Sequence, residues 1–148
     1  MPTEERTITP TVQVREKPSG HSHDVLWVFD PTENDAPFAY TVGLGVRAGR
    51  AYELSCTGLP ADLACAVLNN TAEQLIVDAL DPEDGMDLDE VLTGYTVRLR
   101  PVDKPDALAS IRTTLGTQPP VWQVLWPDAW GRFPGDPGHV DLPPQPLL

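Results

Sequence analysis

Residues 60–80 read PADLACAVLNNTAEQLIVDAL, and they carry the clearest periodic pattern in the chain. Pro60 suits the first turn of a helix, where a missing N–H group costs nothing, and Asp81-Pro82 marks the end of the pattern. Between these points the apolar residues recur at helical spacing on one side: Ala64, Leu68, Ala72, Leu75 and Ala79, with Leu63 and Val67 beside them. The stretch therefore predicts one long helix that covers a hydrophobic core.

Short β-prone runs lie on both sides of this helix, at residues 25–29, 38–44, 51–57, 94–99 and 121–126. A second, shorter helix is predicted after a capping pair formed by Asp103 and Asp106, and Gly116 ends it. Strand runs separated by only two helices favour an α+β fold, because a doubly wound nucleotide-binding fold would alternate strand and helix regularly. We therefore expect a mostly antiparallel sheet with two helices packed on it.

The chain has 148 residues, a length that fits a single domain with a hydrophobic core of its own. We place this domain at residues 25–148 and treat residues 1–24 as an N-terminal arm, in which residues 8–14 could add a peripheral strand. The net charge of -12 repels phosphate backbones and anionic lipids, so neither nucleic acid nor a membrane is expected as a partner. No run resembles a signal peptide or a transmembrane helix, and we expect a cytoplasmic location.

The cysteines and the acidic residues do not form a recognised ligand set. Cys56 and Cys65 are too few for a disulfide framework or a four-ligand zinc site, and we interpret both as buried thiols. Residues 78–90 are strongly acidic, but the spacing of their carboxylates does not match that of the ligands in a helix–loop–helix calcium site. We predict that they form a solvated loop.

Two further patterns point to a metal or a cofactor and are rejected on physical grounds. His21 and His23 could chelate a metal from an extended strand, with His139 or Asp136 as a third ligand, but a polar arm favours exposed histidines. Residues 43–48, GLGVRA, resemble a dinucleotide-binding glycine pattern, yet that motif needs a helix directly after it, where another strand is predicted. We therefore expect no metal and no cofactor.

Four blocks of sequence, taken in order and with their spacing, resemble one known family. They are residues 38–44 (FAYTVGL), 58–60 (GLP), 126–134 (WPDAWGRFP) and 145–148 (QPLL). From about Trp27 onward the chain is similar to a bacterial family of domains of unknown function, numbered 4262. Where this family has a Gly-His-Pro-Glu run, residues 46–53 read VRAGRAYE, so a role for that histidine is not carried over. The resemblance implies a compact bacterial domain and supplies no established activity.

Most of the tryptophans gather in a proline-rich stretch after residue 118, where Asp128 and Arg132 also lie. We predict a small-molecule pocket between this stretch and residues 40–44, because aromatic walls with a few polar groups are typical of ligand sites. Arg132 would bind an anionic group of the ligand, unless it pairs with Asp128 and only fastens the loop. The predicted ligand-binding residues are Tyr40, Thr41, Trp122, Gln123, Trp126, Asp128, Trp130 and Arg132.

Two functional hypotheses follow from these residues. The first is a non-catalytic domain that binds a small molecule or a protein partner in this aromatic pocket. The second is a small enzyme, a hydrolase or transferase, that uses Asp128, Arg132 and Glu53 or a histidine. Convergence of Glu53 on Asp128 and Arg132 in one cleft would favour the enzyme, and scattered positions would favour binding.

Residues 134–148 are rich in proline and glycine, yet we predict that this long C-terminal segment is ordered and docks on the domain. Leu142, Leu147 and Leu148 supply apolar groups that disordered segments lack. Prolines also lower the conformational entropy that docking has to overcome. The segment would then cover the predicted pocket.

Overall fold

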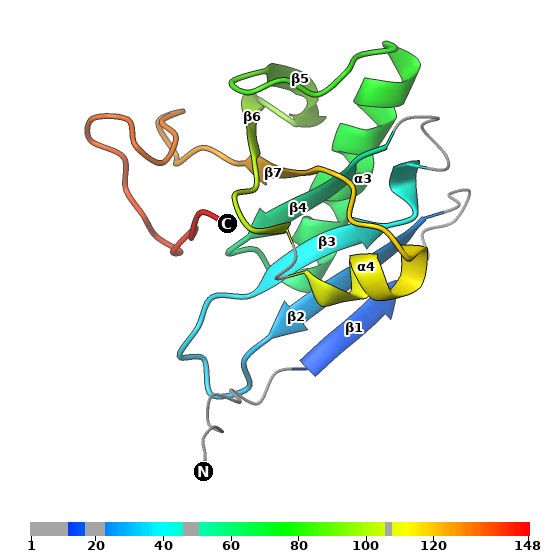
Figure 1. Ribbon diagram of the computed structural model, residues 1–148. Coiled ribbons are helices and arrows are strands. Elements are labelled where there is room, and N and C mark those ends of the chain that lie inside the picture. The colour runs from blue at the N-terminus through cyan, green and yellow to red at the C-terminus, as the bar shows by residue number, and fades with distance from the viewer. Residues whose placement is uncertain (1–11, 17–22, 46–50, 106–107) are drawn as a thin grey trace.

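A mixed β-sheet of seven strands forms the centre of the computed structural model, which describes residues 12–16, 23–45, 51–105 and 108–148 (Figure 1). The strand order is β1-β2-β3-β4-β7-β6-β5. β4 and β7 run parallel at the middle, and every other neighbouring pair is antiparallel. The strands are β1 (Val12–Glu16), β2 (Asp24–Phe29), β3 (Phe38–Val42), β4 (Glu53–Thr57), β5 (Asp87–Leu92), β6 (Tyr95–Pro101) and β7 (Val121–Leu125). The expected α+β fold with a mostly antiparallel sheet is confirmed.

Helices α3 (Ala61–Val77) and α4 (Ala109–Leu115) pack on opposite faces of this sheet. Figure 1 shows α3 behind the sheet and α4 in front of it. The alternation of β3 explains the arrangement, because Ala39 belongs to the core under α3 and its neighbour Tyr40 to the core under α4. Neither helix, among the described residues, is long and apolar enough to cross a membrane.

The long helix lies where its periodicity predicted it. Leu68 and Leu75 are completely buried against the sheet, as the helical stripe requires. The helix ends at Val77, three residues before the predicted end, because Ala79 adopts a left-handed conformation with φ 54°. Burial of this apolar face supplies the main driving force for the α3 side of the fold.

The shorter helix confirms its predicted end and contradicts its predicted start. Gly116 ends α4 in the left-handed conformation, with φ 75°. Leu108 is the residue before the first turn, and no side chain caps it. The predicted cap Asp103 instead pairs with Arg100 at 3.5 Å, and Asp106 lies outside the described residues.

β5 corrects the prediction that residues 78–90 form a solvated loop, because the second half of that segment is a strand. Leu88 and Val91 are buried, while the acidic side chains between them face solvent. Two α3 side chains bind its backbone: Asn70 Nδ2 donates to Val91 O at 3.2 Å, and Glu90 N donates to Gln74 Oε1 at 3.0 Å. These contacts compensate for the weak strand preference of acidic residues.

The N-terminal part of the chain contributes the edge strand β1, which pairs antiparallel with β2 from Val12↔Phe29 to Glu16↔Val25. The weak alternation in residues 8–14 therefore marked a strand, displaced by a few residues. The division into an arm at residues 1–24 and a domain at residues 25–148 stays a prediction, although strand pairing joins part of that arm to the sheet.

Candidate functional site

An apolar pocket of about 460 Å³ lies at one end of the sheet, where α3 begins. Its walls come from three places: the first turns of α3 with Leu63 and Val67, the β5–β6 turn with Leu92 and Tyr95, and residues 126–129 after β7. Pro143 of the C-terminal segment closes a fourth side. The pocket thus joins segments that are far apart in sequence.

Trp126 forms the inner wall of this pocket and is held by hydrogen bonds on three sides. Its indole Nε1 donates to the carbonyl oxygen of Thr57 at 2.8 Å. Its backbone N donates to Gln145 Oε1, and its carbonyl accepts from Gln145 Nε2, both at 2.9 Å. A buried indole that satisfies its N–H in this way presents an apolar ring to the pocket.

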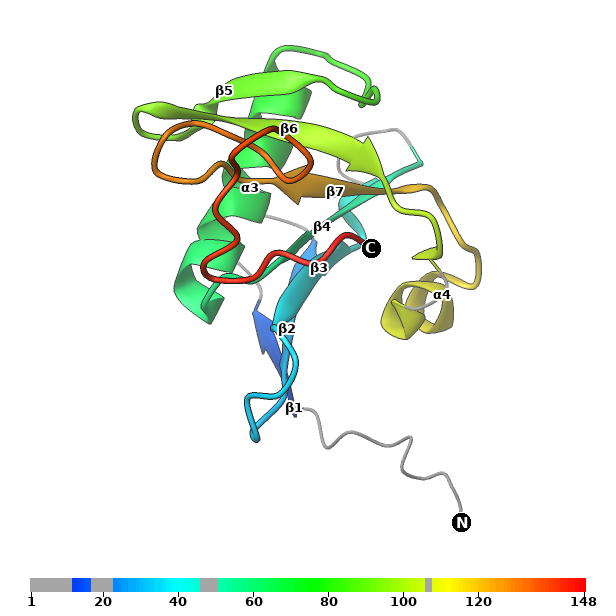
Figure 2. The same ribbon diagram turned by 90° about the vertical axis from the view of Figure 1, so that its left-hand side faces the viewer.

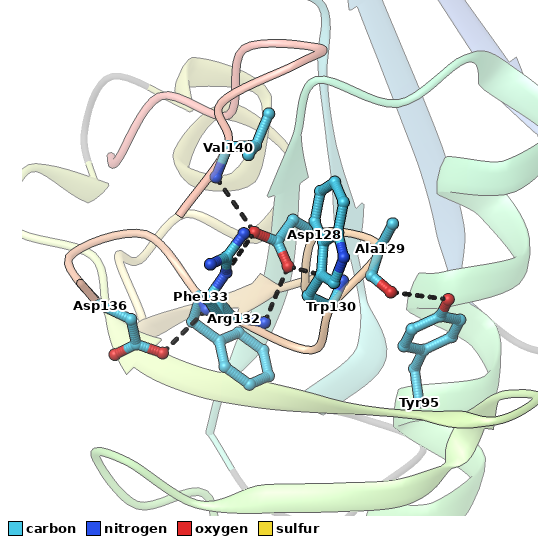
Figure 3. Close-up of polar contacts among 8 residues, drawn as sticks. All are labelled: Tyr95, Asp128, Ala129, Trp130, Arg132, Phe133, Asp136 and Val140. Carbon is cyan, nitrogen blue, oxygen red and sulfur yellow. Dashed lines mark hydrogen bonds and ion pairs between the residues drawn. The ribbon is translucent and has the colours of Figure 1, made fainter. Parts of the chain in front are cut away.

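The carboxylate of Asp128 organises the loop that forms the outer wall (Figure 3). Oδ1 accepts from the backbone N of Trp130 and of Arg132, and Oδ2 accepts from Arg132 Nε and from the backbone N of Val140, at 2.9–3.1 Å. Burial of the carboxyl acts to raise its pKa, but these hydrogen bonds outweigh burial and hold the pKa well below its usual range. The carboxylate is therefore ionised and already bonded.

Arg132 pairs with Asp128 and holds this loop in place, which was the predicted alternative to binding a ligand. Its Nε lies 3.1 Å from Asp128 Oδ2, and its guanidinium carbon lies 5.1 Å from the centre of the Trp130 ring. Trp130 is 69% exposed and does not line the pocket. On the pocket side, the Tyr95 hydroxyl donates to the carbonyl oxygen of Ala129 at 3.4 Å and ties the loop to β6 (Figure 3).

The other predicted ligand-binding residues lie away from the pocket lining. Tyr40 is buried in the core under α4, and the Thr41 hydroxyl donates to Glu53 Oε1 at 2.7 Å. Trp122 is half-buried against the core under α3. Of the eight predicted residues, the structure brings Trp126 and Asp128 together in the pocket lining.

Gln123 is completely buried and connects β4, β6 and the C-terminal segment. Its Nε2 donates to Pro146 O at 2.8 Å and to Thr57 Oγ1 at 3.2 Å. Its Oε1 accepts from Leu148 N at 2.9 Å and from Arg100 Nη1 at 3.2 Å. Gln123 was predicted to bind a ligand, and in the structure its amide holds the protein's own chain.

Glu53 lies at the opposite end of the sheet from Asp128. Its register partner on the parallel strand β7 is Val121, the first residue of that strand, whereas Asp128 follows the last. Its carboxylate is almost completely buried and accepts hydrogen bonds from Thr41 Oγ1 and from the backbone N of Gly43 and Leu44. Burial raises its pKa above the usual value, although the hydrogen bond from Thr41 and those from the backbone act to lower it. Glu53 therefore does not converge with Asp128 and Arg132 on one cleft.

A polar contact at the start of β2 was not foreseen. His23 is completely buried, which corrects the expectation of an exposed histidine, and its Nε2 lies 2.8 Å from Asn69 Oδ1. Asn69 Nδ2 in turn lies 3.2 Å from Cys65 Sγ on the same helix. Cys56 is buried, as predicted, but Cys65 is only partly so. His21, the predicted neighbour of His23 in a metal pair, lies outside the described residues.

One glycine lets the C-terminal segment approach the end of β4 closely. Gly58 has φ +83°, and a Cβ atom added there would overlap Pro144 O. The glycine of the Gly58-Leu59-Pro60 block thus marks a contact between the end of β4 and the C-terminal segment, and the Trp126-to-Pro134 block forms the Asp128 loop. Two of the four sequence blocks that resemble one family, residues 58–60 and 126–134, therefore meet at the pocket.

Comparison with curated proteins and with solved structures gave no match. Comparison with protein families matched residues 19–140 to a domain of unknown function, DUF4262. This match spans the sheet from β2 to β7, both helices and the Asp128 loop. The chain therefore belongs to the DUF4262 family.

Proposed function

We propose that this protein is a non-catalytic binding domain, and that its ligand enters the apolar pocket beside Trp126. The observation that carries the proposal is the pocket itself, which has a volume within the range of small-molecule sites. Leu63 and Tyr95 at its rim are partly exposed, although they are large apolar side chains. Exposed apolar groups around an apolar hollow are typical of a binding surface.

The chemistry of the lining favours an uncharged, mainly apolar small molecule. None of the described residues that line the pocket is Lys, Arg or His. The carboxylate of Asp128 has its acceptor sites filled by the loop, so it is a poor partner for a cationic ligand. Thr93 and the Tyr95 hydroxyl remain as polar groups that could orient a ligand.

The predicted ligand-binding residues divide into two roles under this proposal. Trp126 and Asp128 form walls of the site, and Trp130 and Arg132 shape the loop beside it. Tyr40, Thr41, Trp122 and Gln123 support the sheet and the C-terminal segment rather than contact the ligand. We also propose that this segment is an ordered part of the domain, because Pro143 contributes to the pocket wall.

The enzyme hypothesis has less support, because its candidate catalytic residues lie far apart and already bond other groups of the protein. Asp128 and Arg132 are paired with each other, and Glu53 lies at the far end of β4. A protein partner that inserts an apolar side chain into the pocket is compatible with the same geometry. We also propose a cytoplasmic location. The acidic composition argues against nucleic acid and anionic membranes as partners.

Titration with the neutral dye N-phenyl-naphthylamine, followed by its fluorescence, tests this proposal. We expect saturable binding by the wild type and at least about ten-fold weaker binding by Leu63→Glu, because a carboxylate in an apolar wall has to be desolvated. Val77→Glu is the matched control, since Val77 is an exposed residue at the other end of the same helix. Equal affinity in all three proteins, or no saturable binding by the wild type, would contradict the proposal.

A further inference from the structure

Another hollow, of about 400 Å³, lies where the β2–β3 connection, residues 30–37, meets Gly58 and Pro144. Figure 2 shows this connection extending from the end of the β2–β3 hairpin. The hollow shares no lining residue with the apolar pocket of the proposed function. Its chemistry differs as well, because aromatic rings and carboxylates line it together.

Two aromatic side chains of β2 form one wall of this hollow. Trp27 and Phe29 lie two residues apart, so both point to the same face of the strand, and their rings stack with centroids 4.7 Å apart. The indole Nε1 of Trp27 donates to the carbonyl oxygen of Leu59 at 2.9 Å, which fixes the orientation of the ring. Both side chains remain partly exposed, so ring surface is accessible to a ligand.

A second wall is a turn that the buried carboxylate of Asp30 organises. Its Oδ1 accepts from the backbone N and the hydroxyl of Thr32, and its Oδ2 accepts from the backbone N of Asn34 and of Asp35, at 2.6–3.2 Å. These hydrogen bonds, chiefly the one from the Thr32 hydroxyl, outweigh burial and lower the pKa of Asp30 below its usual value. The turn is therefore held in shape by its own contacts.

Pro144 brings the C-terminal segment to the hollow, and its neighbour Gln145 holds it there. The buried amide of Gln145 bonds both the N–H and the C=O of Trp126, at 2.9 Å. Two of the three leucines that were predicted to anchor this segment, Leu142 and Leu147, are instead 77% and 53% exposed. Polar contacts thus fix this side of the hollow.

The charge of the lining is negative and unbalanced. Glu33 and Asp35 are exposed on the turn, and within the described part of the chain neither carboxylate has a hydrogen bond or an ion pair. None of the described residues that line the hollow is Lys, Arg or His. The acceptor sites of Asp30 are filled, so Glu33 and Asp35 are the carboxylates that remain available to a ligand.

We infer that this hollow binds a small organic cation of the quaternary ammonium class. The faces of aromatic rings attract such cations, and the carboxylates of Glu33 and Asp35 supply the opposite charge. Ala36, Pro37 and Pro144 add apolar surface that suits the alkyl groups of the ligand. A calcium or magnesium ion would instead require oxygen ligands around it, and a wall of aromatic rings does not supply them.

Titration of the full-length protein with choline, followed by the NMR signal of the Trp27 indole N–H, tests this inference. The matched control ligand is 3,3-dimethylbutan-1-ol, which has the shape of choline without its charge. We expect saturable binding of choline and at least about ten-fold weaker binding of the alcohol, because the rings and carboxylates attract only the cation. Added salt should weaken the binding of choline.

Two changes in the protein localise the binding. Glu33→Gln combined with Asp35→Asn removes both available charges at nearly constant shape and should weaken choline binding about five-fold at low salt. Glu83→Gln combined with Asp84→Asn is the control, because it changes the net charge equally at exposed residues outside the hollow and should leave the affinity unchanged. Phe29→Leu removes one ring and should weaken binding at least about three-fold.

Three results would overturn the inference. The first is no saturable binding of choline, or equal affinity for choline and the alcohol. The second is an equal loss of affinity in the two double variants, which would show a response to net charge alone. The third is a shift of the Trp126 indole signal without a shift of the Trp27 signal, which would place choline in the apolar pocket instead.

Discussion

Helix α3 and the C-terminal segment are held on the sheet by different kinds of contact. On one face α3 buries an apolar stripe, with Leu68 and Leu75 completely inaccessible. The C-terminal segment is fixed by polar groups, chiefly the side-chain amides of Gln123 and Gln145. Apolar packing depends on the area removed from water, whereas a polar contact is strong only while both partners are present. The packing of α3 should therefore be robust, and the C-terminal segment should detach more readily.

The largest effect is expected from breaking the α3 face. Leu68→Ala removes a completely buried side chain and should lower the free energy of unfolding by about 2–5 kcal/mol, the usual cost of such a truncation. Chemical denaturation followed by circular dichroism measures this loss. Val77→Ala on the exposed side of the same helix is the control and should change stability by no more than about 0.5 kcal/mol. A loss below about 1 kcal/mol in Leu68→Ala would show that Leu68 does not face the core.

A smaller effect is expected where the C-terminal segment approaches β4. Gly58 and Gly85 both have φ +83°, so an alanine at either position should cost about 1–2 kcal/mol of backbone strain. An added Cβ overlaps Pro144 O at Gly58, whereas it meets nothing within 4 Å at Gly85. We expect Gly58→Ala to lose at least about 1 kcal/mol more than Gly85→Ala, because it also displaces the segment. Equal losses in a denaturation experiment would show that this contact contributes nothing.

Two buried carboxyls should give opposite dependence on pH. The pKa of Asp128 is lower in the folded protein than in the unfolded chain, so its contribution to stability is complete above about pH 3.9 and is lost as the pH falls through the folded pKa. The free-energy difference between wild type and Asp128→Asn should thus shrink in acid. Denaturation of both proteins between pH 3 and pH 7 measures it, and a difference independent of pH would contradict the assigned bonds.

Glu53 should behave in the opposite way, because burial raises its folded pKa. Its contribution to stability decreases as the pH rises from the unfolded value of about 4.3 through the folded pKa. Relative to Glu53→Gln, the wild type should therefore lose stability over this interval. The same denaturation series checks the sign, and a rise in relative stability would show that hydrogen bonds dominate burial at this carboxyl.

The sequence predicted the elements that have their own periodic pattern and missed contacts that depend on distant partners. Helix α3 was placed to within three residues, because its stripe repeats over several turns. β5 was missed, because its charged residues Asp87, Asp89 and Glu90 obscure the alternating pattern of a strand. Side chains of α3 that bond its backbone stabilise this strand, and such contacts cannot be read from the sequence. The loop bond between Asp128 and Arg132 was anticipated as an alternative, because the two lie four residues apart.

The roles of the two glutamines carried no local signal. Gln123 and Gln145 bond main-chain groups that are 19 to 25 residues away, and neither changes a hydrophobic period. The C-terminal segment was expected to dock through its leucines, because apolar residues are the feature of a sequence that indicates burial. A buried amide that bonds a distant backbone can be recognised only after the sheet order is known.

Amide hydrogen exchange along the C-terminal segment tests most directly whether this segment is a docked part of the domain. The amides of Val140, Gln145 and Leu148 donate to Asp128, Asp141 and Gln123 respectively. We predict that they exchange more slowly than in an unfolded chain but faster than the amides of α3. In Gln145→Ala the Leu148 amide should lose its protection while α3 keeps its own. Exchange at unfolded rates throughout residues 140–148 of the wild type would contradict the contacts that dock this segment and make Pro143 part of the pocket wall.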